Sequence, residues 1–176
     1  GHATSTTLVH LLGHPGAASG LAGLLRNDPE APFLIAAAVS SLPGNELPFL
    51  EQLLAAPDWR DSRAGFADVF QTQAAAIAQG GKSDQLNRLL QIAVNETGPK
   101  WQRLAVLSGI RASGLRKVDA RPTALEPAAK ASDPEVAKGA CELMALLVWP
   151  GKFGAGPPPL TAAEQQLFEK GRTAYT

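Results

Sequence analysis

The chain has 176 residues, 45% of them hydrophobic and 18% charged, and its 16 basic and 16 acidic residues leave a formal net charge of zero. A domain of this length buries roughly 70% of the surface of its unfolded chain, so one apolar core is expected. The charge is balanced and forms no basic stripe that would displace counterions from phosphate, which argues against nucleic acid as a partner.

The single cysteine, Cys141, excludes an internal disulfide and a thiolate metal cluster. We expect a buried structural thiol, because Cys141 lies in an apolar helical pattern without a neighbouring His or basic residue that would activate it. The longest apolar stretch, residues 143–149, is much shorter than the ~20 residues of a membrane span, so no membrane insertion is expected. Gly1-His2 is typical of a cleaved tag, and no secretory signal is expected at this N-terminus.

Amphipathic helical patterns follow one another along the chain and are separated by Pro and Gly. Residues 46–56 show the pattern well, because their leucines recur at the spacing of one buried helix face. No segment with a two-residue apolar period is found, so no strand is expected. The predicted helices cover residues 6–12, 17–25, 32–42, 46–56, 62–79, 83–94, 101–113, 123–131 and 135–148.

Short turns between these helices predict that successive helix pairs stack on one another, as in an α-solenoid. The apparent unit is about 35–40 residues, and the turns Asp28-Pro29 and Asp133-Pro134 each precede an apolar helix. Ser83 is expected to cap the start of its helix and Gly114 to end another. The expected fold is therefore all-α, a HEAT/ARM-like right-handed α–α superhelix over residues 1–149.

The composition changes at Pro150. Residues 150–159 are rich in Pro and Gly and predict a linker that is semi-rigid where the prolines run. A last helix is expected to begin after it, because Thr161 and Glu164 have the spacing of a capping box. This helix runs to Tyr175.

Two short motifs are candidates for chemistry. Gly80-Gly81-Lys82-Ser83 resembles part of a phosphate-binding loop, but that loop needs a Gly five residues earlier and a preceding strand, and Ala76 stands there inside a predicted helix. We interpret it as a turn between helices. His10 and His14 have the spacing of two metal ligands on one helix face, but Gly13 and Pro15 interrupt the helix there. We interpret them as surface histidines.

The remaining polar candidates also have simpler interpretations. The loop carboxylates are expected to be caps and turn residues, and Asn95-Glu96-Thr97 would be a glycosylation acceptor only in a eukaryotic secreted protein. Trp59, Trp101 and Trp149 lie at helix boundaries, where filling the corners between stacked helices is favoured over an exposed aromatic surface. The carboxylates are Asp58, Asp61, Asp84 and Asp119. No catalytic, cofactor-binding or metal-binding residue is predicted.

The last predicted helix resembles the first helix of a class I c-type cytochrome. It has the pattern Leu-Thr-x-x-Glu-x-x-x-Phe-x-x-Gly-x-x-x-Tyr from Leu160 to Tyr175. In that family the pattern leads into a Cys-x-x-Cys-His haem attachment, which the resemblance places beyond Thr176. It implies that residues 160–176 open a cytochrome c domain and that haem c belongs to a longer parent protein, with no cofactor in this chain.

The preceding residues are similar to the HEAT-like helical segment of large multidomain dehydrogenases of the planctomycete and verrucomicrobial type. The likeness rests on residues 28–42, on the leucine-rich residues 46–56 and on residues 101–109. In these proteins a sugar-dehydrogenase-like propeller precedes the helical repeats and a cytochrome c domain follows them. The resemblance implies a periplasmic or secreted, non-catalytic scaffold whose partners are other domains of its own polypeptide or another protein.

Two alternatives stay open. The chain could be a free-standing cytosolic HEAT-like protein that binds a partner in a concave groove. It could also be an enzyme or nucleic-acid processor on a HEAT-like scaffold, similar to the helical-repeat alkylpurine glycosylases. The second alternative requires a basic concave face, and the neutral net charge argues against it.

Overall fold

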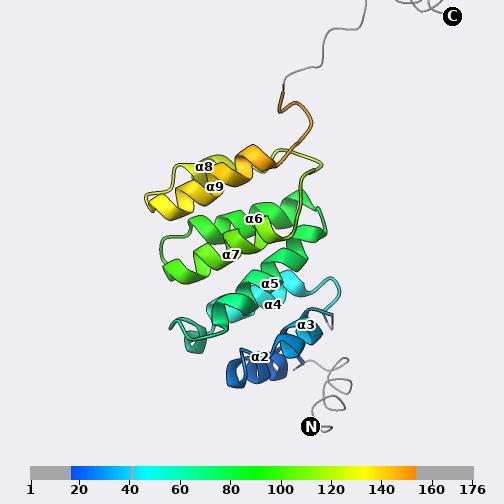
Figure 1. Cartoon of the computed structure of the whole chain (residues 1–176), viewed down its shortest axis with the longest axis vertical. Coiled ribbons are helices and arrows are strands. Elements are labelled where there is room, and N and C mark those ends of the chain that lie inside the picture. Colours follow the sequence, from blue (N-terminus) through cyan, green and yellow to red (C-terminus); the bar gives the residue numbers. More distant parts are fainter. Residues whose placement is uncertain (1–16, 41, 154–176) are drawn as a thin grey trace, which may run out of the picture.

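A computed structural model describes residues 17–40 and 42–153 of the chain. In this part the chain forms α-helices, one 3-10 helix and no strand, with a single isolated parallel bridge between Lys117 and Val148 (Figure 1). The all-α prediction is confirmed for these residues. The elements are α2 (Ala17–Asn27), α3 (Pro32–Ser40), α4 (Glu46–Ala55), η1 (Pro57–Trp59), α5 (Phe66–Gln79), α6 (Ser83–Val94), α7 (Lys100–Ala112), α8 (Leu125–Ala129) and α9 (Pro134–Leu146).

Several predictions concern residues outside the described part of the chain. They are the helix at 6–12, the histidines His10 and His14, most of the linker and the cytochrome-like helix at 160–175.

The described helices form pairs that stack along the long axis of the molecule (Figure 1). The first helices of the pairs, α2, α4, α6 and α8, lie in one layer, and the second helices, α3, α5, α7 and α9, lie in the other. The second helices begin at Pro32, Phe66, Lys100 and Pro134, so each begins 34 residues after the one before. This regular 34-residue register allows equivalent positions of the second helices to be compared directly.

One apolar core runs through the stack between the two layers. Each helix contributes side chains from one face, which is what the leucine and alanine spacing predicts. The described residues form a single connected cluster that reaches from Leu21 to Leu147. At the end of α6, Val94 is only half-buried and the neighbouring Ala93 takes the buried position.

An aromatic cluster fills the corner where α5 and α7 begin. Trp59 is buried and stacks on Phe66 with the ring centroids 4.2 Å apart. Phe70 meets Trp101 edge-on at 5.3 Å, and the Trp101 indole donates a hydrogen bond to the Arg60 carbonyl at 3.0 Å. Trp149 is half-buried against the same core cluster. The three tryptophans therefore pack at the corners between helices, as predicted.

Two helix starts differ from the prediction. The helix expected from residue 62 begins at Phe66, because Gly65 has a left-handed φ of 80° that an α-helix cannot include. A Cβ atom at Gly65 would also lie 2.6 Å from the Pro29 carbonyl group, so the turn before α3 packs directly on the turn before α5. Ser83 is the first residue of α6 and not its cap, because Lys82 occupies the cap position and the Ser83 hydroxyl bonds elsewhere.

Other helix boundaries follow the predicted chemistry. Asp133 caps α9 by accepting hydrogen bonds from the amides of Glu135 and Val136, with Pro134 in the first turn. Gly114 follows α7 with a left-handed φ of 73°, as expected for a residue that ends a helix.

Cys141 is exposed, so its prediction as a buried thiol is wrong. The buried face of α9 carries Val136, Ala140 and Leu143. Cys141 follows Ala140 and is rotated by about 100° around the helix axis from it. The buried and exposed faces of α9 could not be told apart from the apolar composition of residues 136–147, because the helix also exposes short and apolar side chains.

Candidate functional site

The phosphate-loop-like motif is a turn between two helices. Gly80 ends α5 and Gly81 has a left-handed φ of 68°, so the turn follows a helix and not the strand that a phosphate-binding loop requires. The Ser83 hydroxyl donates to Asp119 and accepts a hydrogen bond from the Ala120 amide at 3.1 Å. The motif therefore joins α6 to the segment before α8, and the interpretation as a turn is confirmed.

The predicted turn and cap carboxylates lie at separate places in the stack. Asp58 pairs with Arg26, Asp84 lies in the first turn of α6, and Asp61 is exposed. The hydrogen bond from Ser83 is the largest cause that holds the pKa of Asp119 below its usual value. In residues 17–40 and 42–153, no three His, Cys, Asp or Glu side chains gather closely enough to hold a metal ion.

The Asn95-Glu96-Thr97 segment forms a local turn after α6. The Asn95 side-chain oxygen accepts hydrogen bonds from the Thr97 amide at 3.1 Å and from the Thr97 hydroxyl at 2.7 Å. Glu96 accepts a hydrogen bond from Ser132 in the turn before α9. Side chains thus connect the turns of neighbouring helix pairs.

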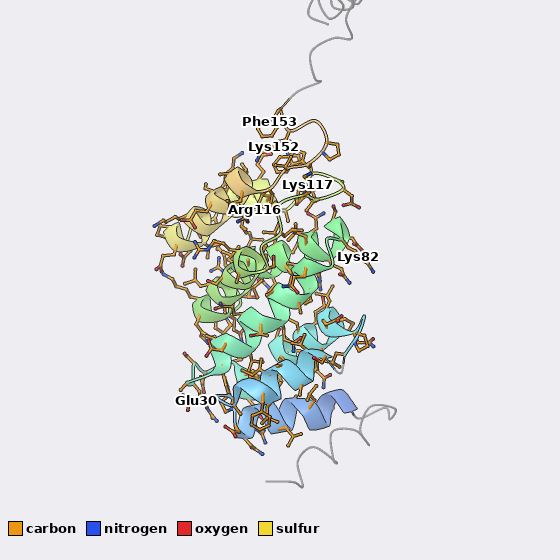
Figure 2. All side chains as sticks on the ribbon, turned by 45° about the vertical axis from the view of Figure 1, so that its right-hand side comes forward. Glu30, Lys82, Arg116, Lys117, Lys152 and Phe153 are labelled. Carbon is orange, nitrogen blue, oxygen red and sulfur yellow. The ribbon has the colours of Figure 1, made fainter. Side chains whose placement is uncertain are left out.

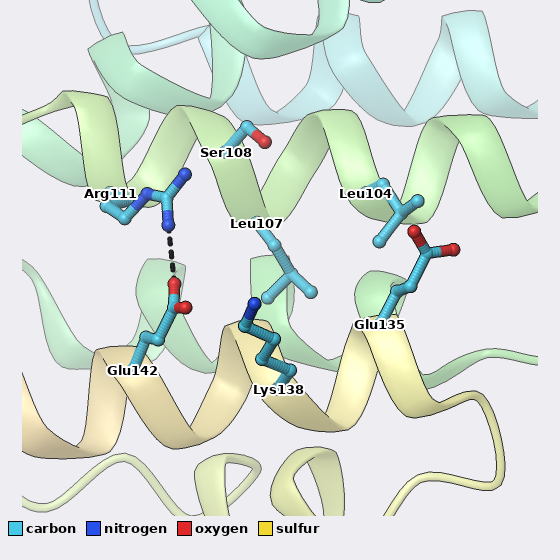
Figure 3. A pocket seen from close by; sticks show the side chains of 8 residues that line it. Leu104, Leu107, Ser108, Arg111, Glu135, Lys138 and Glu142 are labelled. Atoms are coloured by element: carbon cyan, nitrogen blue, oxygen red, sulfur yellow. Dashed lines mark hydrogen bonds and ion pairs between the residues drawn. The ribbon is translucent and has the colours of Figure 1, made fainter.

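One candidate binding surface is a groove between α7 and α9, which we call the α7–α9 groove (Figure 3). It has a cavity volume of about 290 Å³. Arg111 and Glu142 pair across it, and Lys138 lies between Glu142 and Glu135 along α9 (Figure 3). Glu135 also pairs with Lys100. Its lining residues are Leu104, Leu107, Ser108, Arg111, Glu135, Lys138, Gly139 and Glu142.

The charges of the α7–α9 groove are balanced, and polar and apolar surface line it in similar amounts. Exposed ion pairs of this kind contribute about 0–1 kcal/mol to stability. The groove therefore offers a mixed polar surface without a strong preference for one ligand charge.

A second cavity, which we call the arginine pocket, has a volume of about 400 Å³. It opens between α4, α6, the segment 95–99 and the start of α7. Arg60, Arg88 and Arg103 line it, whereas Glu51 is the one acidic residue among its described lining residues. The other lining residues are Leu54, Ala55, Ile92, Asn95, Thr97, Gly98, Pro99 and Gln102.

Two buried side chains of α7 set the inner wall of the arginine pocket. The Gln102 amide donates a 2.6 Å hydrogen bond to the Trp59 carbonyl. Arg103 is only 6% exposed, and its Nε donates to the Ala93 carbonyl at 2.8 Å. The Nη2 atom of Arg103 is buried and has no hydrogen-bond partner among the described residues. A buried guanidinium nitrogen without an acceptor is costly, which distinguishes this pocket from the α7–α9 groove.

Sequence reasoning did not identify the arginine pocket. Its arginines are far apart in the chain and stand in no motif. The available signal was the 34-residue register, in which Arg103 takes the position of Ile35, Val69 and Ala137 in the other second helices. This register became visible only once the helix starts were known.

The end of the described stack carries a patch that is both basic and apolar, which we call the terminal patch. Figure 2 shows Arg116, Lys117, Lys152 and Phe153 at this end of the molecule. The Arg116 carbonyl accepts a 2.7 Å hydrogen bond from the Val148 amide, which holds the segment after α7 against the segment after α9. Phe153 is 80% exposed, and the side chain of Val148 is also exposed.

None of the helices within residues 17–40 and 42–153 combines the length and the apolar character that crossing a bilayer would require. Compared with protein-family models, curated proteins and solved structures, the chain shows no significant match in any of the three.

Proposed function

We propose that this chain is a non-catalytic helical-repeat scaffold that positions other protein modules. We also propose that its stack is the right-handed HEAT/ARM-like superhelix expected from the sequence. The observation that carries the proposal is the 34-residue register of the second helices. Because each pair packs mainly on its neighbours, such a stack sets the distance between its two ends by the number of units it contains. A spacer between two modules needs this property.

Side-chain contacts between successive pairs support the same role. Arg26 pairs with Asp58, Arg88 with Glu51, and Arg111 with Glu142, each time across neighbouring helix pairs. Together with the apolar core, these contacts resist sliding of one pair on the next. A stack with this packing is suited to hold its neighbours in a fixed relation.

We further propose that the neighbours are a dehydrogenase domain and a cytochrome c domain in a periplasmic or secreted parent protein. The support is the resemblance of residues 160–175 to a first cytochrome helix and of the preceding residues to HEAT-like segments of such dehydrogenases. The terminal patch supports it too, because an exposed Phe153 beside Lys117 and Lys152 is a surface on which a following domain can pack. Haem and redox chemistry would belong to the neighbouring domains.

The test uses the natural full-length polypeptide and a variant that lacks residues 66–99. This deletion removes one 34-residue period, which consists of the second helix of one pair, α5, and the first helix of the next pair, α6. In the variant, α7 follows the segment that precedes α5 in the parent and can pair with α4. We expect a covalent haem spectrum in both proteins and unchanged reduction of a soluble dye by the dehydrogenase. Electron transfer from substrate to the covalent haem should slow in the deletion variant.

The control variant is Arg121→Gln, which removes an exposed charge without changing the number of units. Circular dichroism verifies that both variants keep their helices. Equal electron transfer in the deletion variant would contradict the scaffold role. A parent without covalent haem would contradict the redox context and favour a free-standing partner-binding protein.

A further inference from the structure

We propose that the arginine pocket is an anion site that receives the carboxylate of an acidic peptide segment on a partner. The inference rests on the proposed interaction function and deepens it by naming the chemistry of one contact. It does not depend on the redox context, because any acidic segment that docks on the stack would serve.

The first argument is charge. Of the three arginines that line the pocket, only Arg88 has an acidic partner, Glu51. Arg60 and Arg103 form no ion pair among the described residues, although both line the same cavity. Three arginines and one glutamate therefore line the pocket, in a chain whose net charge is zero. An incoming anion would find an excess of positive charge at this place.

The second argument is the unsatisfied donor of Arg103. Nearly all buried polar groups in proteins have a hydrogen-bond partner, and an exception needs a cause such as an absent ligand. Arg103 is held in place through its Nε atom, so its guanidinium cannot turn freely to solvent. Arg103 lines the pocket, and its buried Nη2 atom has no partner among the described residues. A carboxylate supplies the bidentate acceptor that matches a guanidinium group.

The third argument is the register of the stack. The equivalent positions in the other second helices hold Ile35, Val69 and Ala137, and both Ile35 and Val69 are buried. An aliphatic side chain thus satisfies this position elsewhere in the same stack. Apolar packing does not require an arginine there, and the bond from Nε to the Ala93 carbonyl uses only part of the guanidinium group. We therefore assign the rest of this group to recognition.

The lining of the pocket favours a peptide over a free phosphate or a nucleic acid. Leu54, Ala55 and Ile92 give it an aliphatic wall beside the three arginines. The methylene groups of a glutamate and an adjacent apolar residue can pack on such a wall, whereas a phosphate ion cannot use it. The backbone of a nucleic acid would need a longer basic stripe.

The binding experiment uses the full chain and an acetylated, amidated peptide of alternating glutamate and leucine. A peptide with glutamine in place of glutamate and a titration with inorganic phosphate are the two comparison arms. In amide and arginine Nε NMR spectra, we expect the glutamate peptide to shift the signals of Arg60, of Gly98 and of residues 100–103. The glutamine peptide should leave these signals in place.

Two variants assign the binding to the pocket. Arg60→Gln should weaken the affinity for the glutamate peptide about tenfold, the usual effect of losing one charge-assisted hydrogen bond. Arg63→Gln is the matched control, because Arg63 lies over the Phe66 ring and does not line the pocket. Its affinity should stay within about twofold of the parent. Arg103→Met, verified as folded by circular dichroism, should weaken binding at least as much as Arg60→Gln.

Three results would overturn the inference. They are equal binding of the glutamine peptide, an equal loss of affinity in Arg60→Gln and Arg63→Gln, and phosphate binding at these residues without peptide binding. A parent protein without haem would leave the inference intact and would remove only the redox part of the proposed function.

Discussion

A Cβ atom on Gly109 would lie 2.3 Å from the backbone carbonyl oxygen of Gln71. It would also lie 2.7 Å from the Cβ atom of Ala74. These distances show that α7 crosses α5 at Gly109 with the two helix backbones almost in contact. Only a residue without a side chain permits this approach.

We therefore expect Gly109→Ala to lower the free energy of unfolding by about 2–3 kcal/mol, the usual cost of overpacking a core. Gly23→Ala is the matched control, because a Cβ atom there meets no atom within 4 Å. The control should stabilise α2 by up to about 1 kcal/mol, the difference in helix propensity between the two residues. Urea denaturation followed by circular dichroism measures both. A Gly109→Ala variant as stable as the parent would contradict the close approach.

Gln73 and Gln102 are both buried, but only one of them has hydrogen-bond partners. Gln73 is 0% exposed, and neither its Oε1 nor its Nε2 atom has a partner among the described residues. Its equivalent in the next second helix is Leu107, which is buried and apolar. Gln73→Leu should therefore raise the free energy of unfolding by about 1–3 kcal/mol, the cost of an unsatisfied buried polar group.

Gln102→Leu is the contrasting variant. Gln102 donates to the Trp59 carbonyl, and its removal would leave that buried carbonyl without this donor. We expect Gln102→Leu to lower the free energy of unfolding by about 1–3 kcal/mol. Chemical denaturation measures the free energy of unfolding of both variants, which should change in opposite directions. Destabilisation by Gln73→Leu would contradict the cost that we assign to the unpartnered Gln73 amide.

The helical fold could be read from the sequence because its signals are local. Apolar spacing and Pro or Gly punctuation placed each described helix within a few residues of its observed position. The Asp133-Pro134 turn before α9 and Gly114 at the end of α7 were both identified from local turn chemistry. The start of α5 was missed because the left-handed turn at Gly65 packs closely on the backbone of Pro29, which is distant in sequence.

The candidate site could not be predicted, because tertiary packing assembles it. Arg60, Arg88 and Arg103 come from three segments and meet only after the pairs have stacked. The Ser83 side chain is a second case in which a contact between distant segments decides the outcome. Its position suggested a helix cap, but Asp119 lies close enough in the fold to accept a hydrogen bond from the hydroxyl instead.

The cap of α9 should make the stability of the chain depend on pH. Burial by itself raises the pKa of Asp133. The hydrogen bonds from the Val136 and Glu135 amides, together with Lys100 at 3.4 Å, outweigh burial and hold this pKa below its usual value. The ionised carboxylate therefore stabilises the folded state above the ordinary pKa of an aspartate, near 4. This contribution is lost as the pH falls through the lower pKa of the folded state.

Asp133→Asn tests this dependence because asparagine is an equally good cap but carries no charge. We expect the variant to be less stable than the parent at pH 7, with a difference that shrinks as the pH falls below about 4. Asp133→Ala loses the cap as well and should be less stable than Asp133→Asn at every pH. Urea midpoints measured from pH 7 to pH 3 provide the comparison. A constant difference between Asp133→Asn and the parent would contradict the role of the charge.

The other end of α9 depends on Lys152. Its ammonium group donates hydrogen bonds to the carbonyl oxygens of Met144 at 2.6 Å, Ala145 at 3.2 Å and Leu147. It also lies 4.8 Å from the centroid of the Trp149 ring. A positive charge at a helix C-terminus is favoured by the helix dipole and satisfies carbonyls that have no partner within the helix. Lys152 therefore closes the last described helix of the stack.

Lys152→Met keeps most of the apolar stem and removes the charge and the donors. We expect the free energy of unfolding to fall by about 1–2 kcal/mol and amide hydrogen exchange to accelerate in the last turn of α9. Lys138→Met on the exposed face of the same helix is the control and should change stability by less than about 0.5 kcal/mol. Faster exchange throughout α9 in both variants would show that the whole helix frays. Faster exchange confined to the last turn in Lys152→Met would show that this lysine holds the end of the stack on which a following domain would pack.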